Sequence, residues 1–216
     1  MAKRKEQLVI GHYYHVYSRG VDKRDIFVDG EDFGRFLRTM REFNNQEPIG
    51  GLRMHQFYDD QQKKELGRSE PLVHIICYCL NPNHFHMVLE QVAERGVERF
   101  MHRLGTGYTK YFNAKHKRSG TFFQGRFKAA HITTDAYLIH VSVYVNLNNR
   151  VHKLRSPASK SSWQEYIQGL NNNHDDAMCK KEIILGQFKT ILEYRRYAEK
   201  NLPLIQERKE LQKILF

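Results

Sequence analysis

The feature that most restricts the fold is a pair of adjoining strand patterns with a turn signal between them. Residues 72–80 form an almost continuous apolar run, which is typical of a strand inside a sheet. Asn81, Pro82 and Asn83 favour a tight turn, and residues 84–90 then alternate between polar and apolar side chains. These segments predict two antiparallel strands, the first of them central in a sheet.

Two further strand regions and three helices are predicted around this pair. Residues 12–19 are rich in aromatic side chains and favour a strand, and residues 120–132 favour a loop that enters another strand. Apolar side chains recur with helical spacing in three segments, residues 31–45, 97–116 and 135–149. Asp29 is placed to cap the first of these helices. The order of elements predicts an α+β fold in which helices pack on an antiparallel sheet.

The remaining segments are polar or helical. Residues 46–71 are polar and predict an exposed loop or insertion, and residues 153–162 are polar and rich in serine. Helical character returns in two segments, residues 176–200 and 203–215. We therefore expect one α+β domain over residues 1–152 and a small helical extension over residues 153–216.

Several classes of protein are disfavoured. The N-terminal segment lacks the apolar stretch of a secretory signal, and the longest apolar run, residues 72–80, is far shorter than the roughly 20 residues of a membrane-spanning helix. The three cysteines provide no disulfide framework, and Cys77 and Cys79 lie in the apolar run, which predicts two core thiols. We expect a cytoplasmic protein.

The charge of the chain predicts a polyanionic partner. Lys and Arg number 35 against 24 Asp and Glu, which gives a net charge of +11. Nucleic acid is the first expectation and an anionic membrane surface is the second. Residues 95–131 hold much of the excess, and several aromatic side chains are interleaved with it, a combination that suits a single strand with unstacked bases.

Some of these aromatic side chains lie on the apolar face of the predicted helix 97–116 and belong to the core instead. The candidate nucleic-acid contacts are therefore Arg19, Lys110, Phe122, Phe123, Gln124, Arg126 and Lys128.

Two histidines lie on one face of the predicted strand 84–90. Because side chains alternate along a strand, His84 and His86 point to one side, while Phe85, Met87 and Leu89 point into the core. Two imidazoles at this spacing can converge on one divalent cation. The same spacing more often marks two polar side chains on the exposed face of an edge strand, so both interpretations stay open at this point.

The predicted helix 135–149 carries a phenol and a carboxamide one turn apart. Tyr144 and Asn148 share one face, and Tyr137 lies on the same face further toward the N-terminus. The Asn148 oxygen suits a third ligand for a hard cation, and a phenol beside that cation is a candidate nucleophile once it is activated. Ordinary amphipathic helix chemistry is the alternative.

Five motifs in the same order resemble one family, the single-tyrosine HUH transposases of small bacterial insertion sequences. The sequence resembles above all the REP-associated tyrosine transposases. The motifs are His15 to Gly20, Cys79 to Leu89, Tyr108 to Asn113, Phe123 to Lys128 and Tyr144 to Asn148. The resemblance covers residues 8–152, and a weaker similarity continues at Ser161 to Tyr166.

The resemblance implies a ferredoxin-like HUH fold for residues 1–152 and a role for each matching residue. His84 and His86 would be metal ligands, Asn148 the third ligand, and Tyr144 rather than Tyr137 the nucleophile. The implied activity is cleavage of single-stranded DNA next to hairpins through a 5′-phosphotyrosine link, followed by strand rejoining without ATP. Magnesium or manganese would be the cofactor.

The resemblance leaves three matters open. The residue after Asn148 is Asn149, where the family often has proline. The short insertion-sequence transposases are homodimers that share active sites, whereas the REP-associated type is expected to be a monomer. A catalytically silent nucleic-acid-binding regulator with the same fold, and a metal-dependent hydrolase that uses an activated water, are the alternatives to a transposase.

Overall fold

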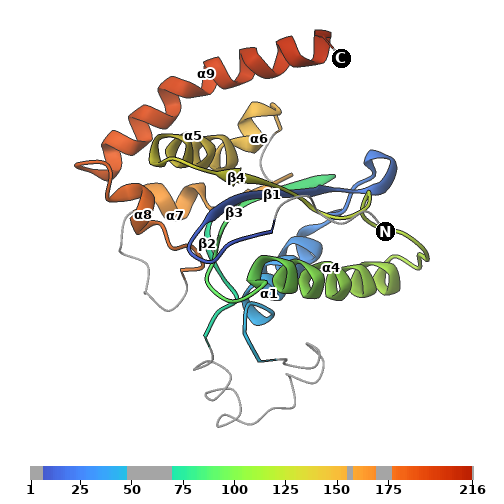
Figure 1. The fold of residues 1–216 in the computed structure, drawn as a ribbon. Coiled ribbons are helices and arrows are strands. Elements are labelled where there is room, and N and C mark those ends of the chain that lie inside the picture. Colours follow the sequence, from blue (N-terminus) through green and yellow to red (C-terminus); the bar gives the residue numbers. More distant parts are fainter. Residues whose placement is uncertain (1–6, 48–69, 155–157, 169–176, 216) are drawn as a thin grey trace.

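In the computed structural model, which describes residues 7–47, 70–154, 158–168 and 177–215, the chain forms a five-stranded antiparallel sheet in the order β4-β1-β3-β2-β5. Helices α1 (Gly30–Glu42) and α4 (Gly96–Lys115) cover one face of the sheet. Helices α5 (Asp135–Asn146), α6 (Asn148–Val151) and α9 (Ile191–Leu215) lie over the other face (Figure 1). The predicted α+β fold is confirmed.

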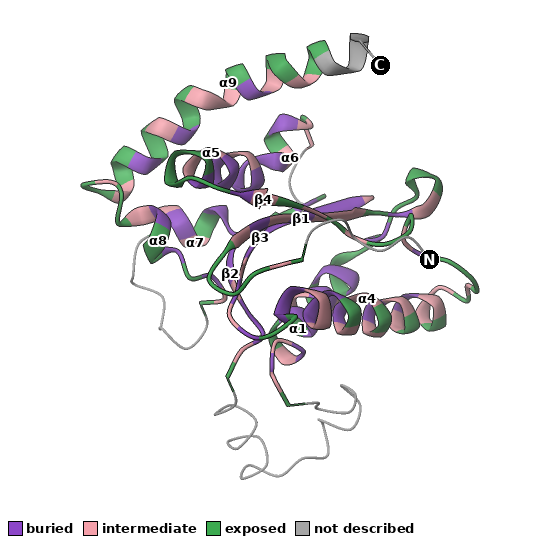
Figure 2. Ribbon diagram, viewed as in Figure 1, coloured by how far each residue is buried: buried purple, intermediate pink, exposed green. Residues whose placement is uncertain are grey.

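The predicted pair of strands forms the middle of the sheet. Strand β2 (Val73–Asn81) pairs with β3 (His84–Gln91), and β1 (Tyr13–Arg19) pairs with the other edge of β3. Strand β4 (Lys128–Ile132) extends the sheet beyond β1. Because helices cover both faces, nearly all side chains of β2 and β3 are buried (Figure 2).

The fifth strand was not predicted. Strand β5 (Lys160–Ser161) lies in the serine-rich stretch and pairs with Cys79 and Leu80 at the free edge of β2. The amide of Ser162 also donates to the Tyr78 carbonyl at 3.0 Å. A strand of two residues has no hydrophobic alternation, so backbone pairing with β2 is the interaction that determines it.

Helix α1 begins as predicted and ends earlier. The Asp29 side chain caps it by accepting a hydrogen bond from the amide of Asp32 at 3.0 Å. The predicted last residues lie beyond the helix because the Asn44 amide group bonds the backbone of Leu72 and Val73 at the start of β2. On this face of the sheet, rings from α1, α4 and β3 pack together.

The helix predicted over residues 135–149 is interrupted. Thr134 caps α5, and the α-helical conformation is lost at Leu147, so Asn148 begins the short helix α6. In the extension, α7 (Trp163–Ile167) and α8 (Glu182–Leu185) are short, and α9 continues through Pro203 as one helix. The prediction of separate helical segments over residues 176–200 and 203–215 is therefore wrong, because one helix spans Ile191–Leu215.

The extension packs on α5 and the sheet. Tyr194 of α9 is buried, and its hydroxyl is bonded to Asn146 Nδ2 at 3.0 Å and to Ser142 Oγ at 3.3 Å. The Tyr166 hydroxyl donates to the Ile76 carbonyl at 2.8 Å. These bonds fix α9 and α7 to the elements they cover.

Most of the predicted loop 46–71 lies outside the described residues, since the structure leaves residues 48–69 undescribed. Cys77, Cys79 and Cys179 are buried free thiols, as predicted for the first two. In the described part of the chain, no helix combines the length and the apolar character that crossing a membrane requires.

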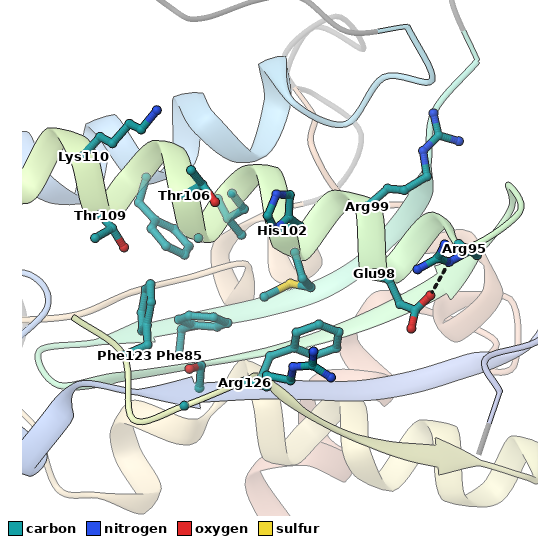
Figure 3. Close-up of a pocket in the computed structure, with 17 residues that line it drawn as sticks. Phe85, Arg95, Glu98, Arg99, His102, Thr106, Thr109, Lys110, Phe123 and Arg126 are labelled. Atoms are coloured by element: carbon teal, nitrogen blue, oxygen red, sulfur yellow. Dashed lines mark hydrogen bonds and ion pairs between the residues drawn. The ribbon is translucent and has the colours of Figure 1, made fainter. Parts of the chain in front are cut away.

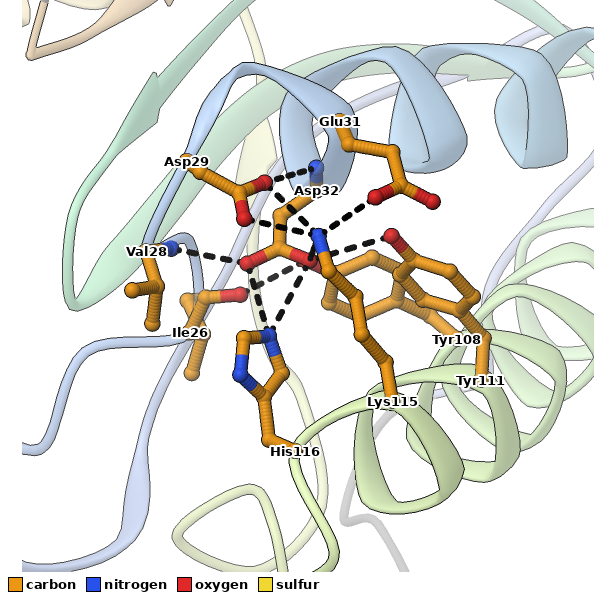
Figure 4. Close-up of polar contacts among 9 residues, drawn as sticks. All are labelled: Ile26, Val28, Asp29, Glu31, Asp32, Tyr108, Tyr111, Lys115 and His116. Carbon is orange, nitrogen blue, oxygen red and sulfur yellow. Dashed lines mark hydrogen bonds and ion pairs between the residues drawn. The ribbon is translucent and has the colours of Figure 1, made fainter.

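A buried carboxylate joins the start of α1 to the end of α4 (Figure 4). Asp32 accepts hydrogen bonds from the Val28 amide at 2.9 Å, from Lys115 Nζ at 3.1 Å and from the Tyr111 hydroxyl at 3.1 Å. His116 Nε2 lies 3.1 Å from the same carboxylate. Burial acts to raise the pKa of Asp32, but these hydrogen bonds outweigh it and hold the pKa below its ordinary value.

We expect Asp32→Asn to lower the free energy of unfolding by about 1–3 kcal/mol at neutral pH, the usual range for hydrogen bonds to a charged group. Because the folded-state pKa of Asp32 is lowered, its contribution is present above the ordinary aspartate pKa and is lost as the pH falls through the lowered value. The stabilities of wild type and variant in urea should therefore begin to converge below about pH 4 and should meet once the pH lies below the lowered pKa of Asp32. Asp25→Asn, at an exposed position, is the matched control.

Candidate active site

The face of the sheet that lies under α5 gathers the predicted histidines. In the register of β1 and β3, Arg19 lies opposite His84 and Tyr17 lies opposite His86. His84 is 5% exposed and His86 is 9% exposed. The interpretation of this pair as side chains on the exposed face of an edge strand is therefore wrong, because β3 is the central strand and helices cover both of its faces.

His84 is oriented by three asparagines. Its Nδ1 lies 2.6 Å from Asn83 Oδ1, so the tautomer with the proton on Nδ1 donates to that oxygen and leaves a lone pair on Nε2. Nε2 lies 3.3 Å from Asn148 Oδ1. The Asn81 amide donates to both atoms, at 3.0 Å to Nε2 and at 2.7 Å to Oδ1. Two electron-pair donors, one from β3 and one from α6, are thus brought together.

His86 is held by another histidine and by tyrosine rings. Its Nδ1 lies 2.8 Å from His15 Nε2, and its ring centroid lies 5.4 Å from that of Tyr17. Burial lowers the pKa of His15 and of His84 to about 4, and it lowers the pKa of His86 well below the ordinary value. These imidazoles are therefore neutral at neutral pH, which is the form that binds a metal ion.

Tyr144 lies in the last turn of α5 with its ring against the histidines. The ring centroid is 5.5 Å from that of His86 and 5.8 Å from that of His15, both in edge-on geometry. Burial raises the pKa of Tyr144, while Asn148 and Arg19 act to lower it, and the net pKa is raised. The phenol is therefore protonated before any reaction. The rival Tyr137 is 42% exposed and does not line the cavity described next.

A cavity of about 360 Å³ opens beside these groups. It is lined by Tyr17, Ser18, Arg19, His84, His86, Gln124, Arg126, Lys128, Tyr144, His152 and Lys209. Seven of the predicted site residues are among them, and Asn148 lies buried behind His84. Among the described residues that line the cavity, four are cationic and none is a carboxylate. We name this space the tyrosine cavity.

Two other predicted contacts, Lys110 and Phe123, lie in a second and larger cavity of about 970 Å³. Figure 3 shows α4 along one side of this cavity and Phe123 with Arg126 opposite. Arg126 lines both cavities. The predicted contact Phe122 is wrong, because this side chain is buried against Phe112 and Tyr108.

The loop that carries Gln124 and Arg126 is fixed to the end of β1. Gly20 and Phe123 form an isolated antiparallel bridge, and the Gln124 amide donates to the Arg19 carbonyl at 2.8 Å. Gly125 has φ of +76°, a conformation that favours glycine. The backbone therefore places the loop side chains beside Arg19.

Four residues that line the tyrosine cavity were not among the predicted site residues. Tyr17 and Ser18 belong to the recognised motif on β1, and Tyr17 shares the strand face of His15 and Arg19, so alternation could have identified it. His152 and Lys209 reach the cavity from the end of α6 and from α9. Nothing in their local sequence signals this position.

The donor chemistry of the site fits a divalent cation. Two neutral imidazoles and a carboxamide oxygen are suitable ligands. In Asn148 the buried Nδ2 atom has no hydrogen-bond partner, whereas the Oδ1 atom accepts a hydrogen bond from Asn81. The single lone pair of His84 Nε2 accepts a hydrogen bond from Asn81, so a cation there would displace that bond. Among the described residues, no group of three or more His, Cys, Asp or Glu is arranged to hold a metal ion.

Comparison with known proteins shows which proteins these residues are similar to. Residues 68–149 match the family described as Transposase IS200 like, a span that includes both histidines, Tyr144 and Asn148. A solved structure of a REP-associated tyrosine transposase bound to a REP hairpin has a similar fold, with a TM-score of 0.53 and 12% sequence identity over 78% of this chain and 87% of that chain. No curated protein matches the sequence. Residues 68–149 of this chain are therefore similar to the IS200-like transposase family.

Proposed function

We propose that this protein is a metal-dependent single-stranded DNA endonuclease and strand transferase that acts next to DNA hairpins. The observation that carries the proposal is the tyrosine cavity, which brings the Tyr144 phenol beside His84 and His86 and lines the same space with four cationic side chains. A nucleophile, a set of neutral metal-binding donors and a surface for phosphate thus occur together.

The reaction follows from the Tyr144 phenol. Its oxygen attacks the phosphorus of a phosphodiester, and the bond from phosphorus to the 3′ oxygen breaks. The strand that ends in this oxygen leaves with a free 3′ hydroxyl, which takes up the proton that the phenol loses. The 5′ phosphate stays on Tyr144, so the bond energy is kept and a 3′ hydroxyl can later reverse the step without ATP. Because burial raises the pKa of Tyr144, the phenol must lose its proton during the attack.

The metal would be held by His84, His86 and Asn148. A bound Mg²⁺ or Mn²⁺ would polarise the phosphate and offset the negative charge that develops on its oxygens. This set of ligands carries no charge, so the DNA phosphate itself would supply the negative charge that balances the ion. His15 and Asn83 keep the two imidazoles in the orientation that such binding needs.

The two cavities support a path for single-stranded DNA. Arg19, Gln124, Arg126 and Lys128 line the tyrosine cavity, while Lys110 and Phe123 line the larger one. Since Arg126 borders both, one strand could contact the two cavities in succession. The fold relative is bound to a REP hairpin, and we extend hairpin recognition to this chain as part of the proposal.

We expect binding of single-stranded DNA to weaken steeply with salt, with a log–log slope of about −0.7 for each phosphate that is neutralised. Arg126→Gln removes a charge that lines both cavities and should make the slope shallower by about 0.7. Fluorescence anisotropy at several salt concentrations measures both values. Lys180→Gln, at an exposed position outside both cavities, should leave the slope unchanged. A flat salt response of the wild type would contradict the basic binding surface.

The experiment that tests the function is incubation of the protein with hairpin-bearing single-stranded DNA and manganese, followed by a denaturing gel. A DNA band shifted by the mass of the protein is the expected product. Intact DNA under Mg²⁺ and Mn²⁺, with tight binding retained, would instead identify a catalytically silent DNA-binding regulator.

A further inference from the structure

The C-terminal helix reaches the tyrosine cavity, and packing and hydrogen bonds hold it there. Helix α9 runs above α5 and α6, on the side away from the sheet (Figure 1). Tyr194, Ala198 and Ile205 are buried in the interface that it forms. Gln206 Nε2 donates to the Arg150 carbonyl of α6 at 2.9 Å, only three residues before Lys209. The position of Lys209 is therefore determined by packing and hydrogen bonds on its own helix.

Lys209 points at the candidate nucleophile. Its Nζ lies 5.7 Å from the centroid of the Tyr144 ring, within cation–π distance. The same ammonium is hydrogen-bonded to His152 Nε2, and the His152 ring centroid lies 4.7 Å from that of His84. Lys209 is also one of the residues that line the cavity with His84, His86 and Tyr144.

The other cations of the cavity come from different elements. Arg19 ends β1, Arg126 belongs to the loop that follows Phe123, and Lys128 begins β4. All three belong to the sheet or to a loop fixed to it, whereas Lys209 comes from the helix layer above it. A phosphate beside Tyr144 would thus have positive charge on two sides, and an ammonium can contact the oxygens that gain charge during attack.

We infer that Lys209 completes the active site as a binding residue for the phosphate that reacts with Tyr144. The residue belongs to the extension, outside the family match over residues 68–149, so the extension supplies part of the chemistry. The inference rests on the proposed function for the reaction, and it makes a separate claim about DNA binding that can be measured without cleavage.

Three variants of the full-length protein test this inference. Lys209→Met removes the charge and keeps an extended side chain, Lys209→Arg keeps the charge, and Lys200→Met removes a charge from an exposed position of the same helix that lies outside the cavity. The rate of adduct formation on hairpin-bearing single-stranded DNA is measured with manganese, and thermal unfolding of each variant reports on its stability.

We expect Lys209→Met to slow adduct formation by about 10- to 100-fold. Lys209→Arg should recover most of the rate, because it keeps the positive charge. Lys200→Met should match the wild type. If residue 209 served only to hold the helix in place, the rate would not follow its charge in this way. A rate for Lys209→Met that equals or exceeds the wild-type rate would overturn the inference, and an increased rate would identify α9 as an obstruction.

Binding distinguishes failure of this inference from failure of the proposed function. If the wild type forms no adduct, the proposed reaction is wrong, but Lys209 is still judged by the salt dependence of binding to single-stranded DNA. Loss of one phosphate contact makes the log–log slope shallower by about 0.7 in Lys209→Met. An unchanged slope would show that Lys209 does not contact phosphate.

Discussion

Replacing Tyr144 with phenylalanine is expected to abolish the covalent adduct with DNA and to leave DNA binding nearly unchanged. The substitution removes only the hydroxyl oxygen, and the ring can still pack edge-on against His86 and His15. Without that oxygen no phosphotyrosine can form, so both adduct and free 3′ product should fall below detection on a denaturing gel. Anisotropy with the same oligonucleotide checks that the variant still binds.

Tyr137→Phe is the matched control for this prediction. Both tyrosines belong to α5, but Tyr137 is exposed and lies outside the tyrosine cavity, so the control should form adduct at the wild-type rate. If Tyr144→Phe still cleaved DNA and released both products without a protein adduct, the enzyme would be a hydrolase that uses an activated water. If only Tyr137→Phe lost the adduct, the assignment of the nucleophile would be wrong.

The sequence predicted the parts of this fold that are specified locally. The strands on either side of Asn81-Pro82-Asn83 were found because apolar runs, alternation and turn residues lie within twenty residues of one another. The positions of His84 and His86 on one strand face followed from the same alternation. The cap that Asp29 provides at the start of α1 is likewise a local feature, and it is confirmed.

The sequence misled where tertiary contacts decide the structure. Proline usually ends a helix, because it lacks an amide proton and its ring crowds the preceding turn. Helix α9 nevertheless continues through Pro203, with Ala198 buried before it and Ile205 buried after it. The buried face is continuous across the proline, and its packing outweighs the cost of the lost hydrogen bond.

The surroundings of the candidate site could be predicted only in part. Helix periodicity put Tyr144 and Asn148 one turn apart, and the two residues remain close to the histidines although the helix is interrupted at Leu147. Helices cover the histidine face because segments more than forty residues apart in the sequence pack together, as β3 and α5 do. The alternation of side chains along a strand carries no information about such packing. Lys209 reaches the cavity in the same way, from a helix more than one hundred residues from β3.

The second large effect is expected on metal binding, from the variant His86→Gln. Glutamine replaces the imidazole nitrogen with a carboxamide oxygen on a flexible side chain, which lacks the ring that the contact with His15 orients. His86 is too buried for a truncation to alanine to be free of packing losses. We expect the affinity for Mn²⁺ to fall by at least about 100-fold, since even loss of an outer-shell partner costs 10- to 100-fold. Metal-dependent cleavage should be lost with it.

Thermal unfolding with manganese measures this loss without reference to activity. At a metal concentration about 100 times the wild-type Kd, binding stabilises the native state by about 2.7 kcal/mol, and a 100-fold weaker site would retain only about 0.4 kcal/mol. A chelator should remove the wild-type stabilisation, and excess manganese should restore it. His74→Gln, at a histidine of β2 outside both cavities, should behave as the wild type does. If His86→Gln were stabilised by manganese as strongly as the wild type, the metal would bind somewhere other than beside Tyr144.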